Sequence, residues 1–285
     1  MSQDKSLVKI DVGDLAAPAT ELIKKISEAL GEIFKPGQIR RIAKAEADAA
    51  IIRAFAKIKI QELQRRALKR FVQEETRKQL NIENITAKAV PELSATANPK
   101  GVENDWIMHF FDKCKIISDE DMQKLWAKIL AGEANVPGSF SKRTIEVVSL
   151  MSKNDANSFE KLCKFSWKIV DDCPLVFNYD NRIYEEEGIG FDVLTHLDSI
   201  GLLTFAHLAG FVRKELSKTI IVSYFGKDVK LEFQKEKDNE LLIGQILLSQ
   251  AGRELISVCK TQPKEGFIDY VKGKWEAEHV VVNIL

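Results

Sequence analysis

The side chains that most often carry chemistry, histidine, cysteine and paired carboxylates, are scattered along this chain. Nucleophilic catalysis needs a Ser or Cys with a His and an orienting carboxylate, and zinc sites need His or Cys at short spacings. The histidines show no HExxH or HxH spacing, and the cysteines form no CxxC pair. They are His109, His196, His207, His279, Cys114, Cys163, Cys173 and Cys259. We therefore expect no catalytic residue and no metal ligand, and a protein that is not an enzyme.

Two glycine-containing stretches and one acidic run are the remaining candidates for ligand chemistry. Residues 31–37 read GEIFKPG and residues 188–191 read GIGF, but neither contains GxxxxGK[ST] or a full GxGxxG after a strand. The acidic run at residues 185–187 consists of consecutive carboxylates, which point in different directions. We interpret all three as turns exposed to solvent and expect no cofactor.

Composition predicts a cytoplasmic protein with reduced thiols. Lys+Arg and Asp+Glu are both 42, so the net charge is zero and gives no overall attraction to nucleic acid. The dispersed cysteines favour free thiols over a disulfide framework. The first 14 residues lack the pattern of a signal peptide, and no apolar run approaches the length that spans a bilayer.

The element with the strongest pattern is a long helix predicted over residues 37–80. After Gly37 this stretch contains neither Pro nor Gly, and apolar or Ala residues recur at steps of three and four. Such a helix would be about 60 Å long, further than a compact domain of this size needs. Residues 40–78 contain twelve basic and five acidic side chains, which gives this segment a net charge of about +7.

This helix is predicted to act by self-association or by docking to a protein partner, with an Ala-rich seam typical of a tight bundle. Contact with nucleic acid stays open as an alternative, as do a fully solvated helix and packing within the same chain. Membrane contact is not favoured, because the amphipathic helix predicted over residues 14–34 lacks a cationic face. The candidate interaction residues are Arg40, Arg41, Lys44, Arg65, Arg66, Lys69, Arg70, Trp106, Trp126 and Arg143.

The predicted fold class is mainly α with a C-terminal α+β module, divided into five parts. Residues 1–13 are a mobile N-terminus, 14–94 a helical stalk, 95–101 a linker, 102–170 a central helical domain and 171–285 the C-terminal α+β module. In the central domain, Ser118 to Asp121 predicts a capping box for a helix that stops at Gly132. A further helix is predicted from Asp155 through Trp167.

The C-terminal module has a pattern similar to the second half of winged-helix domains. A short helix is followed by IGLL, a predicted hairpin at residues 219–225 and 229–233, and then LLSQAGREL. The helix that would enter a DNA groove, residues 192–200, contains two Asp and neither Lys nor Arg. We therefore expect a winged helix that contacts protein rather than DNA.

The segment SDEDMQKLWAKILAGE…PGSFSKRT, with the upstream IFKPGQIRRIAKAEADA, resembles a bacterial family catalogued as domain of unknown function 2806. That family has no assigned activity, so the resemblance implies no catalytic residues. LAAPATELI and LWAKILAGE are also distantly similar to abortive-infection alpha-type proteins, which implies a role in phage defence. We expect a non-enzymatic scaffold or sensor. A nucleic-acid-binding regulator and a membrane-acting abortive-infection effector stay open as alternatives.

Overall fold

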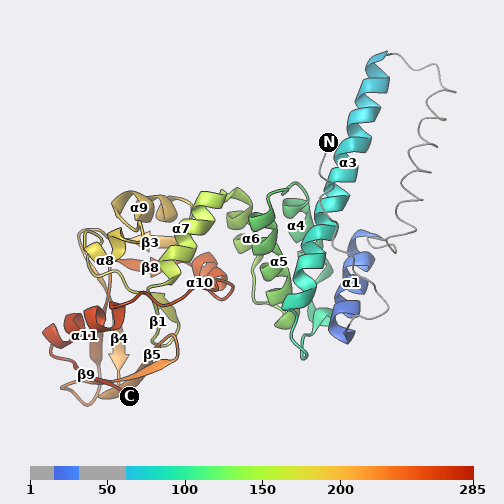
Figure 1. The fold of residues 1–285 in the computed structure, drawn as a ribbon. Coiled ribbons are helices and arrows are strands. Elements are labelled where there is room, and N and C mark those ends of the chain that lie inside the picture. The colour runs from blue at the N-terminus through green and yellow to red at the C-terminus, as the bar shows by residue number, and fades with distance from the viewer. Residues whose placement is uncertain (1–15, 32–61) are drawn as a thin grey trace. The chain divides into compact units, whose positions relative to one another are not determined.

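The computed structural model describes residues 16–31 and 62–285 and divides the chain into two compact units, residues 1–145 and 146–285 (Figure 1). Among the described residues, helices predominate and the strands fall between residues 166 and 284, which confirms the broad fold class. The boundary expected after residue 170 stays a prediction. The mobile N-terminus predicted at residues 1–13 and the stalk residues 32–61 lie outside the described residues.

The first unit begins with α1 (Ala17–Leu30), which packs against α4 (Asn104–Cys114). Pro18 lies in the first turn, where its missing N–H costs nothing. The face that carries Leu22, Ile23 and Ile26 is buried. The amphipathic pattern of this segment is therefore used in contacts within the unit.

Helix α3 (Glu62–Ala89) continues beyond residue 80, where the sequence predicted that the long helix would end. The prediction was wrong because nothing interrupts the helix before Pro91, which lies in the 3-10 turn η2 (Val90–Glu92). The end of α3 packs on α5 (Glu120–Asn135). The expected linker, residues 95–101, includes the 3-10 turn η3 (Pro99–Gly101) and contacts α5 within this unit, where the Asn98 N–H donates to the Ala134 carbonyl at 2.8 Å.

An aromatic cluster forms the core between α4, α5 and the start of α6 (Lys142–Leu150). Phe110 stacks with Trp106 and meets Trp126 edge to face, with ring centroids 5.0 and 5.2 Å apart. The Trp106 indole N–H donates to the Phe140 carbonyl at 2.6 Å, and the Glu133 carboxylate accepts from the Gly138 and Phe140 N–H groups. These bonds hold the loop after α5 against the cluster.

Two details of α5 differ from the prediction. The N-cap is Asp119 rather than Ser118, because its carboxylate accepts from the N–H groups of Asp121 and Met122. The helix also continues past Gly132 to Asn135. Gly132 does not end the helix; it leaves room for Phe140, whose ring would lie 2.7 Å from a Cβ at that position.

The second unit combines a five-stranded antiparallel sheet, in the order β2-β1-β5-β6-β9, with two short strand pairs, β3–β8 and β4–β7. The strands are β1 (Ser166–Lys168), β2 (Asp172–Pro174), β3 (Leu203–Phe205), β4 (Phe211–Leu216), β5 (Thr219–Tyr224), β6 (Lys227–Glu232), β7 (Asn239–Gly244), β8 (Ile246–Leu248) and β9 (Val281–Ile284). The helices are α7 (Lys153–Cys163), α8 (Arg182–Glu185), α9 (Phe191–Ser199), α10 (Gln250–Ile256) and α11 (Phe267–Ala277).

The predicted helix through Trp167 ends at Cys163 instead. Residues 166–168 form a strand, and Trp167 is buried there against Tyr224 and Trp275, with ring centroids 5.2 and 5.0 Å apart. The aromatic spacing that suggested a helix thus reflects burial in a sheet. Contacts with distant residues, rather than the local pattern, therefore determine that this segment is a strand and not a helix.

The predicted hairpin is confirmed as β5 and β6, which pair from Thr219–Glu232 to Tyr224–Lys227. It belongs to the five-stranded sheet, however, and not to the strands that flank α9 and α10. Those strands are β3 and β8, paired antiparallel across residues 203–205 and 246–248. The order helix, strand, strand, helix is therefore present as α9, β3, β8 and α10. Strands β4 to β7 are inserted between β3 and β8.

The contact between Gly132 and Phe140 predicts opposite effects for two glycine substitutions. We expect Gly132→Ala to destabilise the protein by about 1–2 kcal/mol, because a methyl group would press on a buried ring. Gly273→Ala in α11, where a Cβ would meet no atom within 4 Å, should instead stabilise by up to about 1 kcal/mol through helix propensity. Urea unfolding of both variants measures the difference, and equal effects would contradict the packing described here.

Candidate interaction surface

The first two thirds of α3 project from the core of the first unit with apolar side chains in solvent (Figure 1). Leu63 is 68% exposed and Phe71 is 58% exposed, and Leu68 is exposed as well. Further along the same helix Ile85 is fully buried against the core. In the part of the chain that the structure describes, α3 is therefore buried at one end and exposes large apolar side chains at the other.

These apolar residues lie on one side of the helix. Leu63, Ala67 and Phe71 are spaced by four, and Leu68 and Val72 form the neighbouring row. Ile85 and Ala89 lie on the same side further along the helix and are buried, but Glu74, Glu75 and Lys78 separate them from the exposed apolar residues. We call the side chains of Leu63, Ala67, Leu68, Phe71 and Val72 the apolar face of α3.

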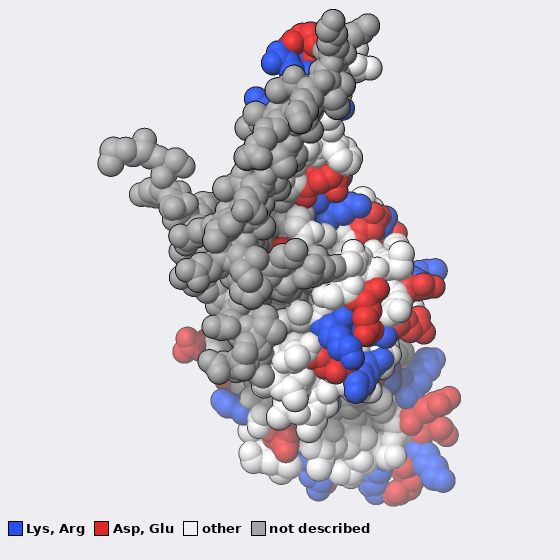
Figure 2. All heavy atoms as spheres, turned by 90° about the vertical axis from the view of Figure 1, so that its right-hand side faces the viewer, with Lys and Arg blue, Asp and Glu red and all other residues white. Residues whose placement is uncertain are grey.

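The cations of α3 lie on the other half of its circumference, which we call its basic face. It carries Arg65, Arg66, Lys69, Arg70 and Arg77, and all five are exposed. Arg65 and Arg70 lie at the edges of this face, because each is two turns from a residue of the apolar face. These two also make ion pairs along the helix, Arg65 with Glu62 at 2.5 Å and Arg70 with Glu74 at 3.6 Å. Exposed pairs of this kind contribute little to stability, so they leave the cations available to a partner. Figure 2, turned toward the α3 side of the molecule, shows basic and acidic side chains close together on the described surface.

The other predicted interaction residues do not join this surface. Trp106 and Trp126 are buried in the aromatic core, so neither is available to a partner. Arg143 is exposed on α6. Arg40, Arg41 and Lys44 lie outside the described residues.

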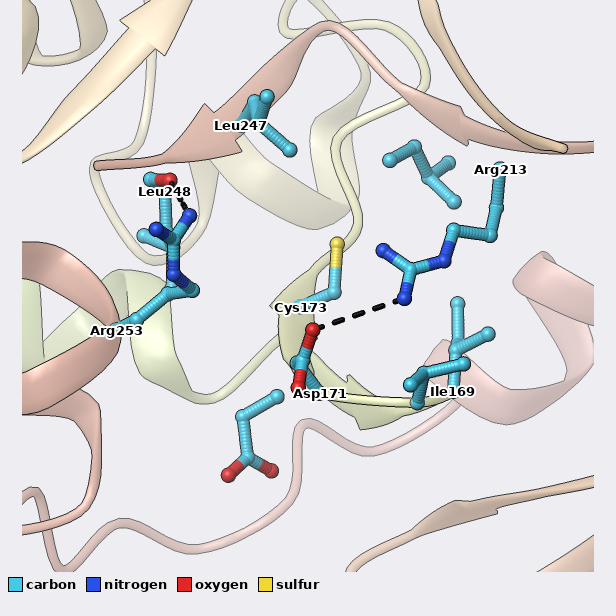
Figure 3. Close-up of a pocket in the computed structure, with 10 residues that line it drawn as sticks. Ile169, Asp171, Cys173, Arg213, Leu247, Leu248 and Arg253 are labelled. Atoms are coloured by element: carbon cyan, nitrogen blue, oxygen red, sulfur yellow. Dashed lines mark hydrogen bonds and ion pairs between the residues drawn. The ribbon is translucent and has the colours of Figure 1, made fainter. Parts of the chain in front are cut away.

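A pocket in the second unit was missed by sequence reasoning (Figure 3). Its volume is ≈ 60 Å³, and its lining comes from residues 169–173, β4, β7, β8 and α10. Arg213 and Arg253 lie on opposite sides of the Cys173 sulfur in Figure 3. The Arg213 guanidinium is 3.7 Å from the Asp171 carboxylate, and Arg253 donates to the Leu248 carbonyl at 2.9 Å. No sequence motif predicts this pocket, because the residues that line it come from segments far apart in the chain.

The Cys173 thiol is neutral at physiological pH. Burial raises its pKa to about 12, although the charge of Arg213 acts in the opposite direction. The Cys114 and Cys163 thiols also have pKa values raised well above the ordinary value by burial. Thiolates are the reactive form, so these three cysteines are poor nucleophiles.

In residues 16–31 and 62–285, no group of three or more His, Cys, Asp or Glu side chains is arranged to hold a metal ion. Within the same ranges, every helix is too short or too polar to cross a bilayer.

These features define a two-unit protein with a projecting amphipathic helix and a small arginine-lined pocket. The family model described as "Protein of unknown function (DUF2806)" matches residues 65–272, and the chain belongs to this family. The resemblance seen in the sequence is thereby confirmed at the level of the family. No curated protein and no solved structure matches the chain.

The raised pKa of Cys173 predicts slow alkylation over a wide pH range. With a pKa of about 12, the thiolate fraction, and therefore the rate with iodoacetamide, should rise about tenfold per pH unit from pH 7 to 10 without levelling off. Peptide mass spectrometry separates Cys173 from the other cysteines, and the protein unfolded in urea provides the control. A rate that reaches a plateau below pH 10 in the folded protein would contradict a buried thiol.

Proposed function

We propose that this protein is a non-enzymatic scaffold that assembles when the apolar face of α3 packs against the same face of a second copy. The observation that carries the proposal is the exposure of Leu63, Leu68 and Phe71 on the same side of α3 that is buried further along the helix. Large apolar residues exposed in a row commonly mark an interaction surface. A pair of such helices would shield Leu63, Leu68 and Phe71 from water.

The charges of α3 favour an antiparallel pair. Residues 65–70 are strongly basic, while Glu74 and Glu75 lie one to two turns further along. An antiparallel pair centred near Arg70 brings Arg65 of one copy, at the edge of the apolar face, opposite Glu75 of the other. A parallel pair would place the basic stretches side by side, where like charges repel. A two-fold axis between identical faces also gives a closed dimer.

The cellular setting rests on resemblance. The similarity of LAAPATELI and LWAKILAGE to abortive-infection alpha-type proteins supports a bacterial, cytoplasmic scaffold or sensor in phage defence. Within it, the β3–β8 pair between α9 and α10 supports a winged-helix-like module. The carboxylates of Asp192 and Asp198 on α9 make protein the favoured partner of that module over DNA.

Two substitutions on opposite sides of α3 test the assembly. Phe71→Glu places a charge on the apolar face and should weaken a dimer at least about 30-fold, as expected for an aromatic residue at the centre of an interface. Gln73→Glu adds the same charge on the basic side and should leave the dimer intact. Light scattering coupled to size exclusion, over a range of concentrations, measures both.

A monomeric full chain, or equal effects of Phe71→Glu and Gln73→Glu, would refute assembly through the apolar face. Removing the whole N-terminal region is a poorer test, because residues 81–89 of α3 belong to the core of the first unit. Point substitutions at exposed positions leave that core unchanged. Circular dichroism would verify that both variants keep their helices.

The basic face supports a second candidate function, binding of nucleic acid. If this face contacts phosphates, the affinity for duplex DNA should fall steeply between 50 and 200 mM salt, and Arg66→Glu with Lys69→Glu should abolish binding. Fluorescence anisotropy with a labelled duplex measures this. Phe71→Glu leaves the basic face intact, so it should still bind duplex DNA, at the lower affinity expected of a single chain. Anionic vesicles in the same assay test the membrane-acting alternative, which predicts instead that Phe71→Glu abolishes binding.

A further inference from the structure

The pocket around Cys173 concentrates hydrogen-bond donors from two arginines in a small space (Figure 3). Each guanidinium carries five N–H groups in a planar fork that suits carboxylate or phosphate oxygens. Arg213 comes from β4 and Arg253 from α10, while Cys173 lies between them on β2. The fold, rather than a local motif, brings these groups together.

A hydrogen bond holds the Arg253 side chain in place and uses only one of the donors of its guanidinium. Its Nη1 donates to the Leu248 carbonyl at 2.9 Å, at the end of β8. This bond uses one donor and fixes the side chain against the strand. The remaining N–H groups of a fixed guanidinium can meet a ligand at a low entropic cost.

Arg213 makes only a loose ion pair. Its Nη2 is 3.7 Å from an Asp171 oxygen, which is beyond the usual length of a hydrogen bond. The two side chains are 42% and 64% exposed, so water screens their attraction. A ligand oxygen at normal hydrogen-bond distance can therefore replace the Asp171 carboxylate.

The rest of the lining is compatible with an anion. Ile243 and Leu248 are buried and form apolar walls of the pocket. The Cys173 thiol is uncharged at neutral pH, so it does not repel an anion. Asp171 and Asp172 also line the pocket and balance the two arginines when it is empty of ligand. An anion must therefore compete with these carboxylates, which limits its affinity.

We infer that this pocket binds a phosphate-sized oxyanion between Arg213 and Arg253. The volume of ≈ 60 Å³ exceeds what one water needs but is far below the about 300 Å³ of pockets that enclose a whole drug-sized ligand. The oxyanion is either free phosphate or the terminal phosphate of a ligand that extends into solvent. This inference is independent of assembly through α3.

The test is a titration of the full chain with inorganic phosphate, with chloride replaced to keep the ionic strength constant. Backbone NMR shifts of residues 170–173, 213 and 253 should change together and saturate. Arg213→Met should weaken binding at least about tenfold, because a charge-assisted hydrogen bond is lost. Lys214→Met is the matched control on the same strand, since Lys214 is exposed, pairs with Glu240 and does not line the pocket. It should bind as the wild type does.

Asp171→Asn separates binding from a purely structural role of this cluster. Removing the competing carboxylate should tighten phosphate binding about three- to tenfold, whereas loss of a structural ion pair would leave it unchanged or weaker. Unsaturable shifts, an Arg213→Met variant that binds like the wild type, or an Asp171→Asn variant that binds no more tightly would each overturn the inference. Phenyl phosphate identifies the source: tighter binding than inorganic phosphate indicates a phosphorylated ligand, and equal or weaker binding indicates free phosphate.

Discussion

The packing of residues 81–89 of α3 on α5 is the constraint on which the proposed surface depends. Buried polar groups surround this contact: the Asn81 amide of α3 donates to the carbonyl of Lys115 at the end of α4, and the Gln123 amide of α5 donates to the Ile117 carbonyl, both at 2.9 Å. The Gln123 amide also donates to the Asn81 side-chain oxygen at 3.3 Å, and Lys88 donates to Gln123. Turning α3 by one residue, about 100°, would leave buried amides without partners. Because α3 is one continuous helix, the same bonds determine which way Leu63 and Phe71 face.

The sequence predicted those features of the fold that depend on local periodicity. The helical repeat of α1 and α3, the start of α5 close to residues 118–121 and the β5–β6 hairpin depend on residues close together in the chain. The predictions were wrong where contacts with residues distant in the sequence determine the local structure. Gly132 looked like a helix end, but Phe140 packs against it, and Trp167 looked helical, but Tyr224 and Trp275 bury it in a sheet. A glycine or an aromatic residue has the same local signature in both settings, so pattern alone could not separate them.

The candidate site was predictable only in part, for the same reason. The cations and apolar residues of α3 could be placed on their faces from spacing, since a helix fixes where each side chain points. That Trp106 and Trp126 are core residues required knowledge of their neighbours, Phe110 and Phe140. The pocket around Cys173 could not be predicted from any pattern in the sequence. Arg213 and Arg253 are forty positions apart and reach Cys173 only because β4, β8 and α10 converge there.

The two faces of α3 allow assembly and anion contact to coexist on a single helix. Burying the apolar face between two copies would leave most of the basic face in solvent, because the faces lie on opposite sides. A dimer would also double the number of cations on one particle, and binding of a long polyanion at two linked sites gains from effective concentration. Assembly would therefore strengthen contact with nucleic acid even if each helix alone binds weakly. The zero net charge of the whole chain conceals this coupling, which arises from where the charges lie on one helix.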